Sequence, residues 1–354
     1  MEIYYLLFIF ITVLGILPID RKLKTSVIIA VLTIFAGTRV DIDSDYPLYR
    51  DVFNFIPDTF SEYKKLYEFE SCLYFVTEFS RSIFYTKEHI VNFSFLTFAF
   101  LGVTTKIISI SKYANYYVLS ILIYLTNLFF IQEMTTIRAG VAAGIFLLAI
   151  PDMIEKRYWL FFLKVALCFV FHSSSVFFII VFVIIKFIPN LKYYYIGLAG
   201  AFILLVLNLD IVSLLRLDLI FPKVAVYLEI MRWLDEEKVN LFNFRIIFSM
   251  FFFFYFAYHY KKYIKDDPYF DTLFKIHIIS LILFFALSLS AVTFSLRSFE
   301  LLSVIQILLY PLLIKTLAPK FKIWGYAAII IICIFQLYYT VEISGIFKPY
   351  KTWL

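Results

Sequence analysis

The residues of this chain whose types could support chemistry are concentrated in a few short polar stretches. The first is TRVDIDSDYPLYRD, residues 38–51, in which aspartates alternate between two arginines. This alternation is typical of the start of a calcium-binding loop. The sixth position of such a loop, however, is Tyr46 where glycine is needed, and the twelfth is Val52 where glutamate is needed. The stretch therefore does not predict a calcium site.

The same stretch favours a site that holds a polar ligand. Tyrosines beside carboxylates suit sugar rings, because the aromatic ring can stack and the phenol can hydrogen-bond. We interpret Asp45 as a candidate catalytic residue and assign substrate contacts to Arg39, Tyr46, Tyr49 and Arg50. The alternative is a solvated polar loop that leaves a membrane helix.

Two further stretches place a titratable side chain inside an apolar run. In IRAGVAAGIFLLAI, residues 137–150, Arg138 precedes small residues that let another helix approach closely. A charge there must face protein or water, so Arg138 is a candidate functional residue; it could instead extend to the membrane surface or pair with Glu133. In FHSSSVFFI, residues 171–179, His172 could act as a general base or a hydrogen-bond donor, or simply belong to a polar turn.

The last polar stretches lie in the C-terminal third of the chain. In LRSFELL, residues 296–302, Arg297 and Glu300 are three residues apart and share a helix face. They can therefore pair with each other or contact a substrate. Arg245, in FNFRIIF at residues 242–248, has the same two interpretations.

The composition defines the solvent in which these residues must work. Hydrophobic residues make up 63% of the chain and charged residues 16%, with a mean hydropathy of +0.89. Soluble domains are about half apolar and a quarter charged, so we predict an all-α, polytopic integral membrane protein. The net charge of +6 does not indicate nucleic-acid binding, because the lysines are spread over many short loops. Three widely separated cysteines predict neither a metal cluster nor a disulfide framework.

Apolar runs of membrane-spanning length recur along the chain and predict about twelve transmembrane helices. An amphipathic piece near 67–86 could be an interfacial or re-entrant helix. No repeat or linker divides the sequence, so residues 1–354 are predicted to form a single transmembrane domain. The apolar runs lie at about 3–19, 26–38, 90–110, 115–132, 136–150, 158–171, 173–188, 193–209, 243–260, 272–293, 299–316 and 322–342.

Positive residues in the short loops predict the orientation of these helices. When the loop that contains Arg21 is placed in the cytoplasm, the basic loops near residues 112, 156, 186–192, 261–265 and 320 fall on the same side. Both termini and two long loops, at about 39–89 and 210–242, are then outside. The candidate residues named above all fall at or near the outer ends of helices.

Taken in order, five stretches resemble the EpsG-like family of Wzy-type polysaccharide polymerases of bacterial envelopes. They are TRVDIDSDYPLY, IRAGVAAGIFLLAI, FHSSSVFFI, LRSFELL and the terminal KPYKTWL, and the likeness extends over nearly the whole chain. The resemblance implies a GT-C-like fold in the bacterial inner (cytoplasmic) membrane, with an active site that faces the periplasm. It implies a lipid-linked oligosaccharide polymerase, a glycosyltransferase that joins undecaprenyl-pyrophosphate-linked repeat units into O-antigen of lipopolysaccharide, capsule or exopolysaccharide.

The implied chemistry gives the candidate residues their roles. The leaving group is a pyrophosphate, whose charge Arg138 and Arg297 could neutralise. The acceptor hydroxyl needs a base, which could be His172 or Asp45. The expected partners are the lipid-linked glycan as donor and acceptor, the lipid bilayer and a chain-length regulator, with no nucleic acid, metal or cofactor. Substrate contacts are assigned to Arg39, Tyr46, Tyr49, Arg50, Arg245 and Glu300.

Two other functions fit the same sequence. An O-antigen ligase-like transferase uses similar arginine and histidine chemistry, but passes finished glycan to a lipid A core. A flippase or transporter of lipid-linked sugars should have ionisable residues near the bilayer midplane and internal repeats. We find few charges in the middle of the spans and no repeat, and the order of the stretches favours a polymerase.

Overall fold

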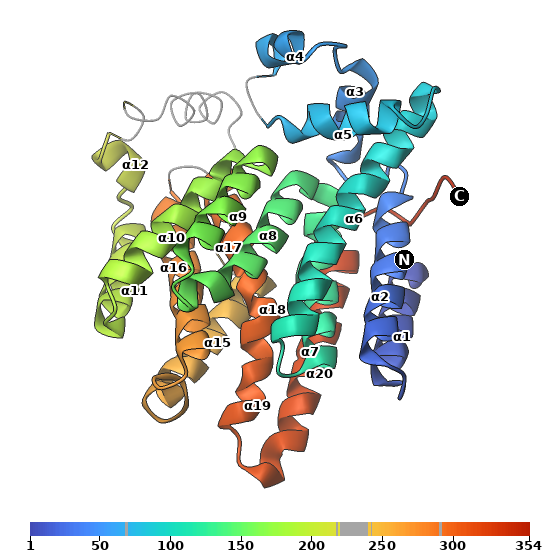
Figure 1. Ribbon diagram of the computed structural model, residues 1–354. Coiled ribbons are helices and arrows are strands. Elements are labelled where there is room, and N and C mark those ends of the chain that lie inside the picture. Colours follow the sequence, from blue (N-terminus) through green and yellow to red (C-terminus); the bar gives the residue numbers. More distant parts are fainter. Residues whose placement is uncertain (68–69, 217–218, 220–239, 242, 290–291) are drawn as a thin grey trace. The chain divides into compact units, whose positions relative to one another are not determined.

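The fold is taken from a computed structural model that describes residues 1–67, 70–216, 219, 240–241, 243–289 and 292–354 (Figure 1). Every regular element within these ranges is a helix, and a single isolated β-bridge joins Arg39 to Thr352. The prediction of an all-helical protein is confirmed. Most of the predicted outer loop at 210–242 lies outside the described residues.

Six described helices are long and apolar enough to cross a membrane. They are Lys87–Tyr113, Tyr117–Thr135, Ile137–Ile154, Pro268–Leu287, Ser295–Thr316 and Pro319–Ile343. The longest has 27 residues, or about 40 Å at the rise of an α-helix, which exceeds the hydrocarbon thickness of a bilayer. The chain therefore has the helices of a multi-pass membrane protein, whereas the predicted count of twelve crossings stays a prediction.

The chain divides into two compact units. Unit 1 contains residues 1–178 and 307–354, and unit 2 contains residues 179–306. In unit 1 the helices are α1 (Glu2–Ile16), α2 (Arg21–Gly37), α3 (Tyr46–Phe55), α4 (Phe60–Leu66), α5 (Cys72–Arg81), α6 (Lys87–Tyr113), α7 (Tyr117–Ile123), the π-helix η1 (Tyr124–Thr135), α8 (Ile137–Ile154), α9 (Tyr158–Phe171), the 3-10 turn η2 (Ser173–Ser175), α19 (Leu313–Thr316) and α20 (Lys322–Tyr338).

Unit 2 is smaller and is built around one central helix. Its helices are α11 (Leu191–Val206), α12 (Ile211–Leu214), α15 (Phe244–His259), α16 (Pro268–Leu287) and α17 (Val292–Leu302). Helix α16 packs against α11, α15 and α17. Two short helices, α10 (Val176–Phe187) and α18 (Gln306–Leu309), carry the chain from one unit to the other.

Local sequence explains where the helices begin. Asp20 accepts hydrogen bonds from the amides of Lys22 and Leu23 and so caps α2, whose own first-turn amides have no helical partner. Thr86 caps α6 in the same way. Asp267 caps α16, which then begins with Pro268, a residue that lacks the amide hydrogen not needed at that position.

Small residues on α8 allow its close approach to α6 and to η1 in unit 1. A Cβ atom added to Gly144 would lie 2.0 Å from Oγ1 of Thr105 on α6, and one added to Gly140 would lie 2.1 Å from the carbonyl oxygen of Gln132. The prediction that the small residues after Arg138 permit close helix packing is confirmed.

The polar stretch that follows α2 forms a separate layer of short helices. Figure 1 shows α3, α4 and α5 grouped at the end of α6 where the chain enters it. Helices α3 and α5 both pack on α6, and the hydroxyls of Ser80 and Ser94 lie 2.9 Å apart across the α5–α6 contact. The amphipathic piece predicted near 67–86 is therefore helical over Cys72–Arg81, and its residues 68–69 lie outside the described residues.

Candidate functional site

The carboxylate of Glu70 contacts two side chains, Arg138 and His172, that come from distant parts of the sequence of unit 1. One of its oxygens lies 2.9 Å from Nδ1 of His172 and accepts the backbone amide of Ser173 at 3.3 Å. The other oxygen is paired with Nη1 of Arg138. The side chains of Glu70 and His172 are 5% and 9% exposed, so this contact is almost completely shielded from solvent. We call Glu70, Arg138 and His172 the carboxylate cluster.

The backbone around each member explains how the cluster forms. Helix α9 ends at His172, which is extended (φ −152°, ψ 122°), and the 3-10 turn η2 begins at the next residue. Arg138 lies in the first turn of α8, directly after the π-helix η1 ends at Thr135. Both side chains therefore project from helix ends, where polar groups can face a cavity or the aqueous surface.

Glu70 is itself held by the loop layer. The hydroxyl of Tyr63 on α4 donates to the carbonyl of Glu70 at 2.8 Å. Burial raises the pKa of Tyr63 above its ordinary value, so its phenol stays protonated and remains a donor. Two residues later, Sγ of Cys72 donates to the carbonyl of Phe171 at 3.6 Å, which fixes the start of α5 beside His172.

Arg138 keeps part of its guanidinium available for a ligand. Its Nε donates to the hydroxyl of Tyr49 at 3.1 Å, its Nη1 binds Glu70, and the guanidinium lies 5.4 Å from the centre of the Tyr49 ring. Among the described residues, Nη2 has no hydrogen-bond partner. The side chain is 23% exposed, so Nη2 can meet an anionic group from outside the protein.

Arg39, predicted to bind substrate, lies instead in the interior. It is fully buried; its Nε donates to Asp43 at 3.0 Å, its Nη1 to the Ala36 carbonyl at 2.8 Å, and its Nη2 to the Met134 carbonyl. The guanidinium also lies 4.9 Å from the centre of the Phe95 ring. This geometry does not support the substrate contact predicted for Arg39, and we assign this arginine a structural role.

The alternating aspartates do not converge on one point. Asp43 binds Arg39 and accepts the amides of Asp45 and Tyr46, whereas exposed Asp41 lies 3.3 Å from Nζ of Lys348. Asp41 has a φ of 48°, in the left-handed region, which aspartate tolerates better than most residues. The backbone therefore turns between the two side chains. Asp45 precedes the first residue of α3 and accepts the Ser44 hydroxyl at 3.2 Å.

The three residues of α3 that were predicted to contact substrate, Tyr46, Tyr49 and Arg50, lie in different surroundings. Tyr46 and Tyr49 are each 4% exposed; the Tyr46 ring stacks on Phe95 at 4.7 Å, and Tyr49 reaches the carboxylate cluster through Arg138. Arg50 is exposed. Tyr49 is therefore the residue of this helix that the structure joins to the cluster.

Glu133, considered above as a partner for Arg138, pairs with another residue. Its Oε1 lies 2.5 Å from Nζ of Lys106 and 3.0 Å from the Tyr124 hydroxyl, and both charged side chains are fully buried. Lys106 also donates to the Gly140 carbonyl at 2.7 Å. This ion pair connects α6, η1 and α8, so it fixes the segment from which Arg138 projects.

Three candidate residues lie in unit 2. Arg245 binds Glu300 at 2.8 Å, with side chains 10% and 19% exposed. Arg297 lies on the same helix as Glu300 and is exposed. The arginine that pairs with Glu300 is the more distant Arg245. Their predicted roles at the substrate stay predictions.

Glu70 is the residue to which sequence reasoning gave no role. It is separated from Arg138 by 68 positions and from His172 by 102, and it lies in no recognisable spacing pattern. The available signal was a carboxylate at the start of an amphipathic helix, in the loop predicted to share a side of the membrane with Arg138 and His172.

The fold and the carboxylate cluster together define a helical, multi-pass membrane protein with a polar site at the ends of its helices. The model of the EpsG family matches residues 22–352, and the chain belongs to that family. The EpsG family is associated with polysaccharide polymerisation, which is the activity of a glycosyltransferase-like enzyme. Neither a curated protein nor a solved structure matches the chain.

Proposed function

We propose that this protein polymerises undecaprenyl-pyrophosphate-linked oligosaccharide repeat units at the periplasmic face of the bacterial inner membrane. The observation that carries the proposal is the carboxylate cluster, in which a partly exposed arginine with an open Nη2 lies beside a buried carboxylate–imidazole pair. A glycosyl transfer from a pyrophosphate needs a cation for the leaving group and a base for the acceptor. This cluster can supply both.

The reaction assigns a separate task to each member of the cluster. The acceptor hydroxyl oxygen forms a bond to the anomeric carbon of the donor glycan, and the bond from that carbon to the pyrophosphate oxygen breaks. When Nδ1–H of His172 donates to Glu70, its Nε2 is the ring nitrogen that can accept the hydroxyl proton. Arg138 binds the departing pyrophosphate through Nη2, and Glu70 and Tyr49 hold the guanidinium in place.

The distribution of basic residues in unit 1 supports an outward-facing site. Arg21 begins α2 and lies over the ring of Tyr117, which begins α7, while Lys112 lies in the last turn of α6. Helix α6 runs from the layer of α3 and α5 to Lys112, so the basic ends lie opposite the carboxylate cluster. Under the positive-inside rule, the cluster then faces the periplasm.

The remaining assignments are part of the same proposal. The GT-C-like arrangement of about twelve crossings leaves both termini outside. Arg297 is a second cation for the pyrophosphate, Asp45 an alternative base, and Arg50, Arg245 and Glu300 are contacts to the glycan. A chain-length regulator is the expected protein partner.

Polymerisation by the purified protein tests the proposal. The full chain, reconstituted in liposomes with a lipid-linked repeat unit, should give a ladder of glycans on a gel. Glu70→Gln should abolish the ladder, since a neutral amide cannot balance both Arg138 and a protonated His172. Glu78→Gln is the matched control. Glu78 also binds an arginine, Arg81 at 2.7 Å, and lies on α5 in the layer of short helices, but it is not part of the carboxylate cluster. Single transfers without a ladder would indicate a ligase, and translocation without new glycosidic bonds would indicate a flippase.

A further inference from the structure

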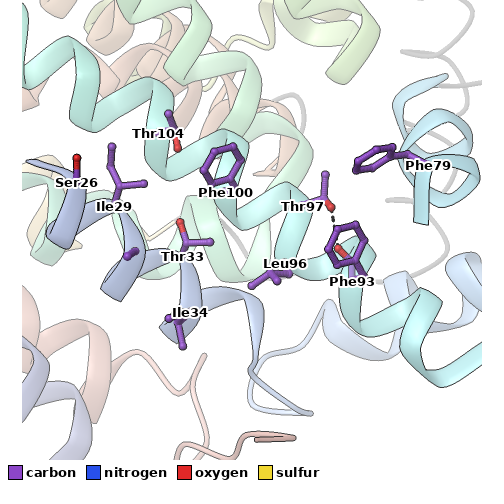
Figure 2. A pocket seen from close by; sticks show the side chains of 11 residues that line it. Ser26, Ile29, Thr33, Ile34, Phe79, Phe93, Leu96, Thr97, Phe100 and Thr104 are labelled. Carbon is purple, nitrogen blue, oxygen red and sulfur yellow. Dashed lines mark hydrogen bonds between the residues drawn. The ribbon is translucent and has the colours of Figure 1, made fainter. Parts of the chain in front are cut away.

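An apolar groove in unit 1 runs between α2 and α6, and α6 is one of the helices long and apolar enough to cross a membrane (Figure 2). It encloses about 600 Å³, a volume within the range of small-molecule binding pockets. On α2 it extends from Ser26 to Ile34, nine residues that cover about 12 Å of helix. Its lining also includes Ala30 and Phe100, both partly open to the surroundings. A groove of this shape suits part of a long hydrocarbon chain.

The groove reaches the layer that holds the carboxylate cluster. At its outer end α2 and α6 touch, since a Cβ atom on Gly37 would lie 2.7 Å from Cα of Leu96. There Phe79 on α5 also lines it, and its ring centre lies 5.8 Å from that of Phe93 on α6. The other end of α5 is fixed beside His172 through the contact of Cys72 with Phe171. One short helix therefore connects the groove to the cluster.

Two hydroxyls in the groove lack a partner among the described residues. Oγ1 of Thr33, on a side chain more than nine-tenths buried, and Oγ1 of Thr104 make no hydrogen bond there. Figure 2 shows both hydroxyls directed into the space between the helices. Thr97 on the same face of α6 instead donates to the Phe93 carbonyl at 2.8 Å, which is the usual solution for a threonine in an apolar helix. The two free hydroxyls can donate weakly to the π-electrons of a double bond, which a saturated acyl chain lacks.

We propose that this groove binds the polyprenyl chain of the lipid-linked substrate, in the part next to the pyrophosphate. This inference rests on the proposed function, since it places the hydrocarbon of that substrate. An apolar, unsaturated chain that lies along α2 and α6 would pass Phe79 at the outer end of the groove and present its pyrophosphate to the loop layer. The groove would then orient the donor before the glycosyl transfer.

Photo-crosslinking of the full chain tests the groove without requiring turnover. The probe is undecaprenyl pyrophosphate with a diazirine in the isoprene units next to the pyrophosphate, in liposomes of phosphatidylethanolamine and phosphatidylglycerol. Mass spectrometry should locate adducts on Thr33, Phe100 and Thr104. Ala30→Trp fills the groove and should lower labelling about tenfold, equivalent to about 1.4 kcal/mol of lost contact. Ala328→Trp is the matched control, because Ala328 is an exposed alanine on the membrane-spanning helix α20.

The free hydroxyls provide a second test. Thr33→Val combined with Thr104→Val keeps the shape of both side chains, and should lower labelling by the polyprenyl probe roughly threefold while leaving labelling by a saturated acyl probe unchanged. If raising the mole fraction of phosphatidylglycerol in these liposomes lowered labelling as much as adding unlabelled undecaprenyl pyrophosphate does, the proposal would be overturned and the groove would be a general lipid site. Protection of the groove by a second copy of the chain, seen as a dimer, would also overturn it.

The outcomes separate this inference from the proposed function. If the wild-type protein polymerises and Ala30→Trp both polymerises and labels normally, the groove proposal fails while the function stands. If the probe labels the groove but the wild-type protein forms no ladder, the polymerase proposal fails while polyprenyl binding stands.

Discussion

Replacing Arg138 by lysine tests the proposed role of its guanidinium, because the substitution keeps the charge and removes the planar fork. Arg138 binds Glu70 through Nη1 and Tyr49 through Nε at 3.1 Å, which leaves Nη2 for a pyrophosphate oxygen. A lysine ammonium is a single point charge and cannot occupy these three positions together. If the lysine keeps the ion pair with Glu70, it loses the contact with the pyrophosphate. If it binds the pyrophosphate instead, it loses the contacts that hold Arg138 to Glu70 and Tyr49.

The expected size follows from the contacts that are lost. A hydrogen bond to a charged group is worth about 1.5–3 kcal/mol, and a contact of that size made in the transition state changes the rate about ten- to a hundredfold. We therefore expect Arg138→Lys to slow chain growth by at least about tenfold. The lysine still neutralises the buried Glu70 carboxylate, so the protein should accumulate in the membrane at its normal level.

The assay compares polymer ladders at matched protein levels in a strain that lacks the wild-type gene. Arg157→Lys is the control: Arg157 also binds a buried carboxylate, with its Nε 2.8 Å from Asp152, but it follows the far end of α8. That variant should give wild-type ladders. Wild-type ladders from Arg138→Lys as well would refute the reasoning and make Arg138 an ordinary anchor at the membrane surface.

Four further predictions follow from the assignments above. Arg297→Lys should shorten the polymer in the same assay if Arg297 contacts the pyrophosphate, and a normal ladder would remove it from the site. Lys106→Met should destabilise the purified protein by about 3–5 kcal/mol because it leaves the buried Glu133 carboxylate unpaired, whereas adding Glu133→Leu should restore most of the thermal stability. A double variant no more stable than the single one would contradict this. A cysteine at exposed Ser61 should react with a membrane-impermeant thiol reagent in intact spheroplasts once Cys72 is replaced; labelling only after lysis would reverse the orientation. Burial raises the pKa of the Cys72 thiol to about 12, so the chain that keeps Cys72 and lacks the Ser61 substitution should show little labelling. Polymerisation should also persist in excess EDTA, and loss that one added ion restores would show that a metal is required.

The sequence by itself determined that the chain is helical and that α8 packs closely against its neighbours. Long apolar runs must become helices in a bilayer, where every backbone polar group needs an internal partner, and each of these runs contains a helix in the described residues, although several runs extend two or three residues beyond the helix end. The small residues after Arg138 likewise predicted close packing, because only glycine fits where α6 and η1 approach α8. Both conclusions depend on neighbouring residues alone, so one sequence was sufficient for them.

Only the tertiary structure decided which charges meet. Glu133 and Arg138 are five residues apart, but the backbone bends between them at Thr136 (φ −94°, ψ 54°), so Glu133 turns to Lys106 and Arg138 turns to Glu70. Arg39 is buried because the C-terminal segment returns to it: the amide of Val40 donates to the carbonyl of Lys351 at 3.0 Å. These pairings join residues between 27 and 311 positions apart. Their formation depends on how whole helices pack, which the spacing of residues along the chain does not specify.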